Sequence, residues 1–175
     1  ALMASGLVAV LIDGGMAPRR ILQALRTSRA RAVVSVPALF RLRFVLPALW
    51  GRRWYCVGGA GLGIRPFGAL LRAGPADAVP RAPTDHALIT FTSGSTGRPK
   101  GADRTHGLLI AQHEALAEHF PHRDDEVDCP AFPVVVLHDL CCGVTAAVPP
   151  IDFRAVASAD RDRVLAFARR HGVTR

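Results

Sequence analysis

The ten residues Thr92-Ser93-Gly94-Ser95-Thr96-Gly97-Arg98-Pro99-Lys100-Gly101 decide how the rest of this chain is interpreted. Three glycines, four hydroxyl side chains and one lysine stand together in this 92–101 loop, after the apolar run 87–91 and before a helical pattern that begins near Arg104. Glycines let successive backbone N–H groups point at one oxyanion, and hydroxyls and a lysine add further donors. A strand, a Gly/Ser/Thr loop and a helix in this order predict a phosphate-binding loop.

The lysine of this loop is unusual in the chain. Of the 22 lysine and arginine residues, Lys100 is the only lysine. A compact, mobile ammonium group suits phosphate, which favours a binding role for this residue. The chain also lacks asparagine and is rich in Ala, Arg, Gly and Pro, a bias typical of GC-rich coding DNA and a simpler reason for arginine elsewhere.

Two better-known phosphate loops do not fit this sequence. A Walker A loop needs Gly, four residues, and then Gly-Lys-Ser/Thr. Counted from Gly94, Pro99 stands where the second glycine should be, and Gly101 follows the lysine. The glycine-rich segment 58–63 does not complete the dinucleotide pattern Gly-x-Gly-x-x-Gly from either possible start. A flexible Gly/Ser linker is the structural alternative, and Pro99-Lys100 with the flanking strand and helix disfavours it.

The composition predicts a globular domain, because 50% of the 175 residues are hydrophobic. The net charge of +8 allows a nucleic-acid partner, but the arginines are scattered and only 6% of the residues are aromatic, so such a partner is disfavoured. Residues 1–12 are apolar but too short to span a bilayer, and they lack the features of a signal peptide. Because residue 1 is not methionine, we expect the chain to be an internal piece of something longer.

The cysteines show no Cys-x-x-Cys pair and no repeated metal spacing. Their positions are Cys56, Cys129, Cys141 and Cys142, and the last two are adjacent and can scarcely bond to each other without backbone strain. His138, Asp139 and Cys141 are close in sequence, but on an apolar stretch this grouping is more typical of a packed core than of a metal site. The sequence therefore predicts reduced thiols, a cytoplasmic protein and no metal site.

Apolar strands alternate with amphipathic helices, which predicts an α/β fold with mainly parallel strands. A strand at 8–12 is followed by a helix from Pro18 that places Ile21, Leu22 and Leu25 on one face. The other expected elements are strands at 32–36, 54–57 and 87–91, helices at 38–50, 64–73, 105–120 and 160–171, and an exposed connection at 74–83.

For the last two expected helices, at 105–120 and 160–171, the sequence also predicts which residues face inward. The first should pack through Leu109, Leu116 and Phe120, with its N-terminal dipole close enough to the 92–101 loop to assist anion binding. His113 and His119 are expected at solvated or edge positions rather than as ligands. The second helix should turn Val164, Phe167 and Ala168 inward and end at Gly172.

The 92–101 loop resembles the signature loop of the AMP-forming adenylate ligases, the family of acyl-CoA synthetases, peptide-synthetase adenylation domains and luciferases. That pattern is Gly-Ser-Thr-Gly-x-Pro-Lys-Gly after Ser/Thr-rich residues, with a histidine five residues later, here His106. Segments 2–13 and 153–174 are similar to the family as well. Segments 126–128, 132–133 and 143–146 resemble the β-lactone synthetase branch of olefin biosynthesis. Val136 stands where acyl-CoA synthetases usually carry a histidine, which favours that branch or a chain that has drifted.

The resemblance implies part of the large N-terminal domain of such a ligase, incomplete at both ends and without the C-terminal lid domain. It implies a reaction in which a fatty or β-hydroxy acid and ATP, with Mg²⁺, give acyl-AMP and pyrophosphate. The catalytic residues stay unassigned, because the family's adenine, ribose and catalytic-lysine segments are not found here. By the resemblance, the β- and γ-phosphates are held by Thr92, Ser93, Gly94, Ser95, Thr96, Gly97 and Lys100.

Three functions stay open from the sequence. The first is a segment of an adenylate-forming ligase whose longer parent is the enzyme. The second is a non-catalytic remnant that only binds nucleotide or phosphate through the 92–101 loop, and the third is a basic protein that binds nucleic acid. We expect that the isolated chain does not complete adenylation.

Overall fold

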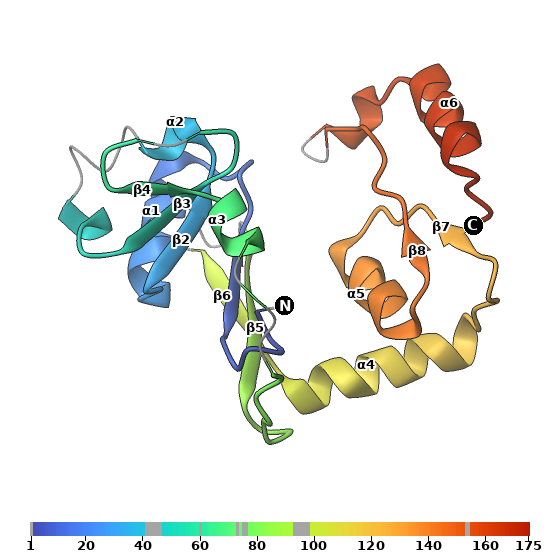
Figure 1. Cartoon of the computed structure of the whole chain (residues 1–175), viewed down its shortest axis with the longest axis horizontal. Coiled ribbons are helices and arrows are strands. Elements are labelled where there is room, and N and C mark those ends of the chain that lie inside the picture. Colours follow the sequence, from blue (N-terminus) through green and yellow to red (C-terminus); the bar gives the residue numbers. More distant parts are fainter. Residues whose placement is uncertain are drawn as a thin grey trace. The chain divides into compact units, whose positions relative to one another are not determined.

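Parallel strands joined through helices recur along the chain (Figure 1). The computed structural model describes residues 2–40, 47–59, 61–72, 74, 77–92, 99–152 and 155–175. These residues divide into two compact units, Ala1–His106 and Gly107–Arg175. The predicted α/β class with mainly parallel strands is confirmed.

The first sheet of the first unit contains the strand that leads into the 92–101 loop. Its strands are β1 (Ala9–Ile12), β5 (His86–Thr92) and β6 (Lys100–Thr105), in the order β1-β5-β6. β1 runs parallel to β5, and β6 runs antiparallel to it. The strands predicted at 8–12 and 87–91 are confirmed, but β6 was not predicted. Glycine and polar residues give Lys100–Thr105 little strand propensity of its own, so pairing with β5 decides its conformation.

The second sheet has only parallel strands, in the order β2-β3-β4. Its strands are β2 (Ala32–Ser35), β3 (Arg53–Cys56) and β4 (Ile64–Pro66). The helix predicted at 64–73 is therefore wrong over its first three residues, and of the described residues in this range only those of α3 (Gly68–Leu71) are helical. Pairing with β3 overrides the local pattern at β4, and Pro66 is tolerated because β4 lies at the edge of the sheet.

The helices of the first unit cover this second sheet's apolar residues. α1 (Pro18–Ser28) begins at a proline, as predicted. Near the C-terminal end of this helix, the Arg52 guanidinium donates to the backbone oxygens of Leu25 and Ala30, at 2.9 and 2.8 Å. Such contacts satisfy carbonyl groups that the helix leaves unpaired. Within the helix predicted at 38–50, the described residues form α2 (Pro37–Phe40) and η2 (Pro47–Leu49), and 41–46 lie outside the described residues.

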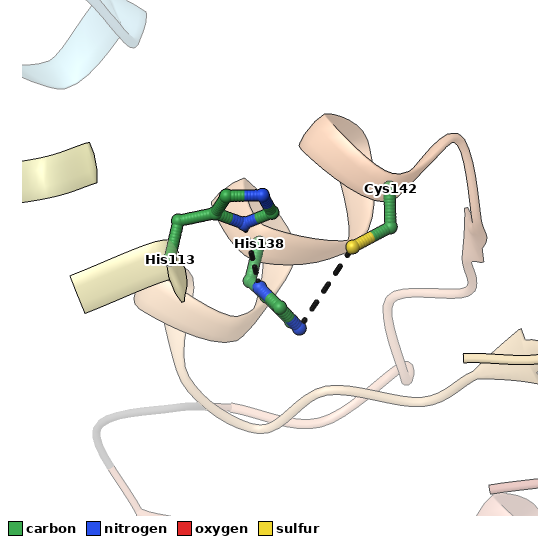
Figure 2. A group of neighbouring side chains, drawn as sticks. All are labelled: His113, His138 and Cys142. Carbon is green, nitrogen blue, oxygen red and sulfur yellow. Dashed lines mark hydrogen bonds between the residues drawn. The ribbon is translucent and has the colours of Figure 1, made fainter. Parts of the chain in front are cut away.

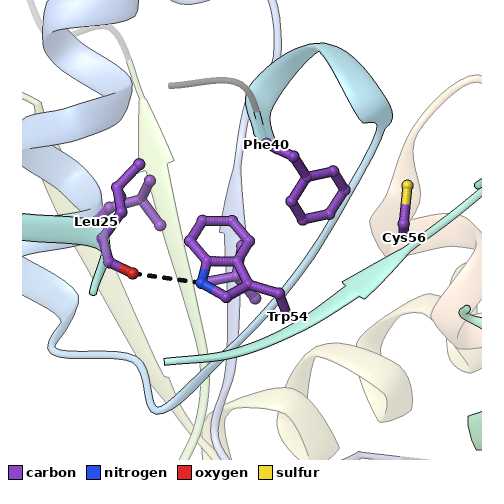
Figure 3. Close-up of a cluster of buried hydrophobic side chains, with 6 residues drawn as sticks. Leu25, Phe40, Trp54 and Cys56 are labelled. Atoms are coloured by element: carbon purple, nitrogen blue, oxygen red, sulfur yellow. Dashed lines mark hydrogen bonds between the residues drawn. The ribbon is translucent and has the colours of Figure 1, made fainter. Parts of the chain in front are cut away.

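An apolar cluster holds the first unit together (Figure 3). Phe40 and Trp54 meet edge to face with ring centroids 5.2 Å apart, and the Trp54 indole N–H donates to the Leu49 carbonyl at 3.3 Å. Ile12 of β1 also packs against the cluster, which ties the first sheet to it. Each large side chain buried here stabilises the fold by about 1.5–3 kcal/mol. The buried members are Leu25, Val33, Phe40, Leu49, Trp54 and Cys56.

The second unit is built from short elements. They are α4 (His106–His119), whose first residue belongs to the first unit, β7 (Val127–Asp128), α5 (Pro133–Cys142), β8 (Thr145–Ala146), η3 (Val156–Ser158) and α6 (Arg161–His171). β7 and β8, which α5 connects along the chain, pair in parallel. The backbone of Thr174 donates to Val127 at 2.9 Å, so the end of the described chain lies along β7.

The two longer helices predicted in this unit are confirmed, with one error in packing. Leu109 and Leu116 are half-buried as expected, but Phe120 is 55% exposed. Phe120 stands just beyond the end of α4, and the Arg175 guanidinium lies over its ring, 5.9 Å from the ring centroid. In α6, Val164, Phe167 and Ala168 are half-buried and Gly172 ends the helix with φ of 63°.

Candidate functional site

The 92–101 loop leaves the first sheet at the edge where two parallel strands end. In the register of β1 and β5, Ile12 lies opposite Phe91, so Asp13 and Thr92 follow at the same edge. Asp13 accepts a hydrogen bond from the backbone of Gly15 at 2.8 Å, which closes its own turn. Ligands in open α/β sheets bind outside the carboxyl ends of the strands. The sequence-predicted loop therefore starts at the edge where such a site is expected.

Both ends of the loop are held beside each other. Thr92, the last residue of β5, pairs with Lys100, the first residue of β6. The Lys100 side chain is exposed. The other predicted phosphate ligands, Ser93, Gly94, Ser95, Thr96 and Gly97, lie outside the described residues, and so does the side chain of Thr92. The structure thus brings together the backbones of the first and last predicted residues of the site, and places the lysine on the surface.

The register of this hairpin has two local supports. A Cβ at Gly101 would lie 3.3 Å from atoms of both Ile89 and Phe91, so only glycine lets β6 approach β5 without a shift there. Arg104 donates to the Thr90 hydroxyl at 2.6 Å. A slip of one residue would turn every side chain of β6 to the other face of the sheet. These contacts keep Lys100 opposite the end of β5.

The expected order of strand, loop and helix is wrong. The six-residue strand β6 separates the loop from α4, which begins at His106. A helix dipole acts within about the first turn of the helix, so the α4 N-terminus is not the anion-binding end of this loop. The loop connects two antiparallel strands, so the predicted anion binding would depend on its own backbone, hydroxyl groups and lysine.

A second group of chemically active side chains lies in the second unit. His138 of α5 is 3% exposed, and its Nδ1 lies 2.8 Å from Nδ1 of His113 on α4. Its Nε2 lies 3.9 Å from Sγ of Cys142 (Figure 2). The same Nε2 lies 2.8 Å from Nε2 of His122. The His122 Nδ1 lies 3.3 Å from a carboxylate oxygen of Glu126. We call His113, His122, His138 and Cys142 the His–Cys cluster.

The proton positions in this cluster follow from Glu126. A carboxylate only accepts hydrogen bonds, so with neutral imidazoles His122 carries its proton on Nδ1 and leaves Nε2 as an acceptor. His138 then donates from Nε2 to His122, and its Nδ1 accepts from Nδ1–H of His113. One carboxylate thereby sets the tautomers of three histidines in series.

Burial shifts the pKa values of the cluster. Burial, and then the neighbouring His122 and His113, lower the pKa of His138, which keeps it neutral. Burial, and then Cys141, raise the pKa of the Cys142 thiol. Partial burial of Glu126 works against ionisation, but hydrogen bonds from the Arg123 backbone and His122, with the charge of Arg175, leave its pKa lowered overall.

A buried acidic pair lies beside the cluster. Asp139 is fully buried, and neither of its carboxylate oxygens has a hydrogen-bond partner among the described residues. Burial, and then the charge of Asp128, raise its pKa. Asp128 is itself buried, and one of its oxygens lies 3.8 Å from Nε of Arg175. Asp139 thus carries a desolvation cost that the charge of Arg175 offsets only in part.

Sequence reasoning missed most of this cluster. His113 was expected in solvent or at an edge, but it is half-buried against His138. His138 and Asp139 are buried, as expected for a packed segment, whereas Cys141 is exposed. The available signal was the four-residue spacing from His138 to Cys142, which places both on one face of a helix. The contribution of α4 depends on tertiary packing and has no local signature.

The cysteines and the helices add two observations. Cys56, Cys129, Cys141 and Cys142 form no disulfide in the structure, and the redox state of their thiols stays a prediction. Among the described residues, no helix combines the length and the apolar character needed to cross a bilayer.

Comparisons with known proteins place the chain in a family. A family model described as "AMP-binding enzyme" matches residues 1–174. An olefin beta-lactone synthetase from Stenotrophomonas maltophilia is 36% identical over 99% of this chain and 32% of its own length. Another, from Xanthomonas campestris, is 34% identical over the same shares of the two chains. The chain therefore spans about a third of the length of the curated relatives it matches.

A solved structure agrees with this placement at the level of the fold. The anthranilate CoA ligase AuaEII, in complex with anthranoyl-AMP, superposes with a TM-score of 0.81. The match covers 99% of this chain and 35% of that one, with 20% sequence identity. The fold expected from the resemblance to adenylate-forming ligases is thereby confirmed.

Proposed function

Because this chain belongs to the family of AMP-binding enzymes, we propose that it supplies the phosphate-binding part of an enzyme that activates a carboxylic acid with ATP. In this reaction a carboxylate oxygen attacks the α-phosphorus of ATP, the bond to the β-phosphate oxygen breaks, and acyl-AMP and pyrophosphate form. The chain spans about a third of its curated relatives, so the complete reaction is proposed for a protein of their length.

One observation supports this proposal above the others. The 92–101 loop starts at the carboxyl end of β5, and its lysine is held opposite Thr92 at the loop's base. Pyrophosphate leaves easily only when its developing charge is stabilised, which backbone N–H groups, hydroxyls and an ammonium group can do. We assign this role, on the β- and γ-phosphates, to Thr92, Ser93, Gly94, Ser95, Thr96, Gly97 and Lys100.

The donor set also fits ATP bound with Mg²⁺. The exposed Lys100 and the hydroxyls of the loop offer cationic and neutral donors to an anionic polyphosphate. Mg²⁺ usually keeps several waters and is held largely through the phosphates themselves, so the ion would enter with the nucleotide. It would neutralise charge on the leaving pyrophosphate, while the loop orients the phosphates.

The acid substrate is proposed from the curated relatives. Both are olefin beta-lactone synthetases, which supports a β-hydroxy acid over an unsubstituted fatty acid. For a protein of the relatives' length, pyrophosphate release should be faster with a long-chain β-hydroxy acid than with the same acid lacking the hydroxyl. Equal rates with both acids would contradict this choice of substrate and leave the phosphate-binding role intact.

Calorimetric titration of this chain with ATP and Mg²⁺ tests the phosphate site. Replacing Lys100 by Ala should weaken binding by about 10- to 100-fold, since a charge-assisted hydrogen bond contributes about 1.5–3 kcal/mol. Arg161→Ala removes the same charge from an exposed position at the start of α6 and should change the affinity by less than about twofold.

The outcomes separate the possible functions. Binding by the wild type that depends on Lys100, without acyl-AMP formation, supports a phosphate-binding part that needs the rest of a longer enzyme. Equal losses in both variants would indicate a general charge effect, as expected of a basic nucleic-acid-binding protein, and would overturn the proposal. The absence of any ATP binding by the folded wild type would also overturn it for this chain.

A further inference from the structure

Three side chains of the second unit gather two imidazoles and one thiol around a single point. One ligand atom from each of His113, His138 and Cys142 lies within 4.8 Å of the others (Figure 2). His113 comes from α4, and the other two come from one face of α5 because they are four residues apart. The proposed phosphate loop uses none of these residues.

We propose that His113, His138 and Cys142 bind a divalent transition-metal ion, with Zn²⁺ as the first candidate. Two imidazole nitrogens and a thiolate suit the borderline-soft ions such as Zn²⁺ and Co²⁺ rather than Mg²⁺ or Ca²⁺, which take oxygen ligands. The site is independent of the proposed phosphate loop and departs from the expectation, drawn from cysteine spacing, that the chain has no metal site.

The distances are close to those of a tetrahedral site. With metal–nitrogen distances of about 2.05 Å and metal–sulfur distances of about 2.3 Å, tetrahedral ligand atoms lie about 3.3–3.6 Å apart. One ligand atom from each of His113, His138 and Cys142 lies within 4.8 Å of the others, so a modest contraction reaches this range. The 3.9 Å contact joins Nε2 of His138 to Cys142, whereas the 2.8 Å contact with His113 uses the opposite ring nitrogen, Nδ1. His138 is fixed by burial while Cys142 is exposed, so rotation of the cysteine and of His113 can bring the atoms to coordination distance.

His122 is a candidate for the fourth ligand of a tetrahedral metal site, and Glu126 orients its ring. The Nε2 of His122 lies 2.8 Å from Nε2 of His138, and its Nδ1 faces the Glu126 carboxylate at 3.3 Å. Metal-binding histidines characteristically donate their second ring N–H to a carboxylate, which orients the ring and fixes the tautomer. Glu126 in turn accepts from the Arg123 backbone and lies 3.4 Å from Arg175. His122 therefore presents a lone pair to the site in the absence of metal.

Metal binding releases protons from the ligand side chains. Bonds form from the metal to imidazole nitrogens and to the Cys142 sulfur, and the thiol proton leaves to solvent. Where Nε2 of His138 becomes a ligand, its proton moves to Nδ1 of the same ring. The rotation of His113 that brings its own lone pair to the metal then breaks the Nδ1–Nδ1 hydrogen bond between the two rings. No oxidant or reductant takes part.

Titration of the full 175-residue chain with Co²⁺ alone tests the site, because a thiolate–Co²⁺ bond gives charge-transfer absorption that imidazole or carboxylate ligands do not. The wild type should show this band, and Zn²⁺ should displace it. Cys142→Ser should abolish the band and weaken binding by about 100-fold, since loss of a metal ligand costs at least as much as loss of an outer-shell residue. Cys141→Ser, at the adjacent exposed thiol, should leave the band unchanged.

The histidine requirement has its own matched pair. His113→Gln should weaken Co²⁺ binding by about tenfold or more, while His119→Gln, at an exposed position on the same helix, should change it less than about twofold. These positions and Cys142 are not fully buried, so each variant can be checked for native helix content by circular dichroism before titration. Absence of the band in the folded wild type, or equal losses for Cys141→Ser and Cys142→Ser, would overturn the proposal.

Discussion

The two units differ in what they bury. The buried Ala, Val, Leu, Met, Phe, Trp and Cys side chains among the described residues all lie in the first unit, from Met16 to Phe91, and the only buried apolar residues described in the second unit are Pro130 and Pro149. The buried polar side chains of the described chain, Asp128, His138 and Asp139, all lie in the second unit. The first unit is therefore stabilised by apolar burial, which is non-directional, whereas the second depends on hydrogen bonds and charge.

The two units should therefore lose stability through different kinds of substitution. An apolar core loses free energy in proportion to the volume removed from it. A polar interior loses or gains free energy according to whether each buried group has a partner. The His–Cys cluster is internally connected, whereas Asp139 has no partner among the described residues, so the second unit contains both a satisfied and an unsatisfied polar group.

The largest expected effect is on the apolar core. Phe40→Ala should lower the free energy of unfolding of the first unit by about 3–5 kcal/mol, because it removes a ring that is 4% exposed and packs on Trp54. Both tryptophans, Trp50 and Trp54, belong to this unit, so denaturation followed by tryptophan fluorescence reports on it.

The same substitution in the second unit provides the comparison. Phe132 precedes α5 and is 69% exposed, so Phe132→Ala should cost less than about 1 kcal/mol, measured by hydrogen exchange of residues 107–175. A loss from Phe132→Ala as large as that from Phe40→Ala would mean that the second unit has an apolar core after all.

The second unit should gain stability when its unpaired carboxylate is neutralised. A raised pKa in the folded state means that the folded chain binds the Asp139 proton more tightly than the unfolded chain does. Its contribution to stability is therefore lost as pH rises from the ordinary carboxyl pKa through the raised one. Above this window, Asp139→Asn should raise the free energy of unfolding of the second unit by about 1–3 kcal/mol and flatten its pH dependence.

Hydrogen exchange of the α5 amides at several pH values measures this effect. Asp124→Asn, at an exposed position of the same unit, is the matched control and should change stability by less than about 0.5 kcal/mol. If Asp139→Asn destabilises the second unit at all pH values, the carboxylate has a stabilising partner, and the unit's interior is more complete than its hydrogen bonds indicate.

Within the first unit, the strands with an apolar sequence pattern were predicted correctly, whereas the strand that follows the 92–101 loop was not. Strands at 8–12, 32–36, 54–57 and 87–91 were found because short, largely apolar runs, two of them closed by Pro37 and Gly58, are strong local signals. β4 and β6 were missed, since neither Ile64–Pro66 nor Lys100–Thr105 has a strand pattern of its own. Both are strands only because a neighbouring strand pairs with them, which is a tertiary effect.

The two candidate sites differ in the same way. The 92–101 loop is contiguous, so its residue types could be recognised in the sequence, although the strand that follows it could not. The His–Cys cluster draws on α4, the segment after it and α5, and only the His138–Cys142 spacing is local. His113 and His122 meet His138 through packing of the second unit, which no pattern of one sequence encodes.

The smallest predicted effect concerns how each unit keeps a helix of equal length. α1 and α6 both have 11 residues, but α1 buries Ala24 and Leu25 and has no side-chain cap, whereas α6 buries no residue fully. At α6, the Asp160 carboxylate accepts from the backbone N–H groups of Asp162 and Arg163, at 2.9 and 3.2 Å. Asp160→Ala should therefore lower the stability of α6 by about 1 kcal/mol, measured by hydrogen exchange of its amides, while Asp160→Asn keeps a capping side chain and should cost only a few tenths. Equal exchange in the wild type and Asp160→Ala would show that packing fixes α6, as it fixes α1, and would remove this difference between the two units.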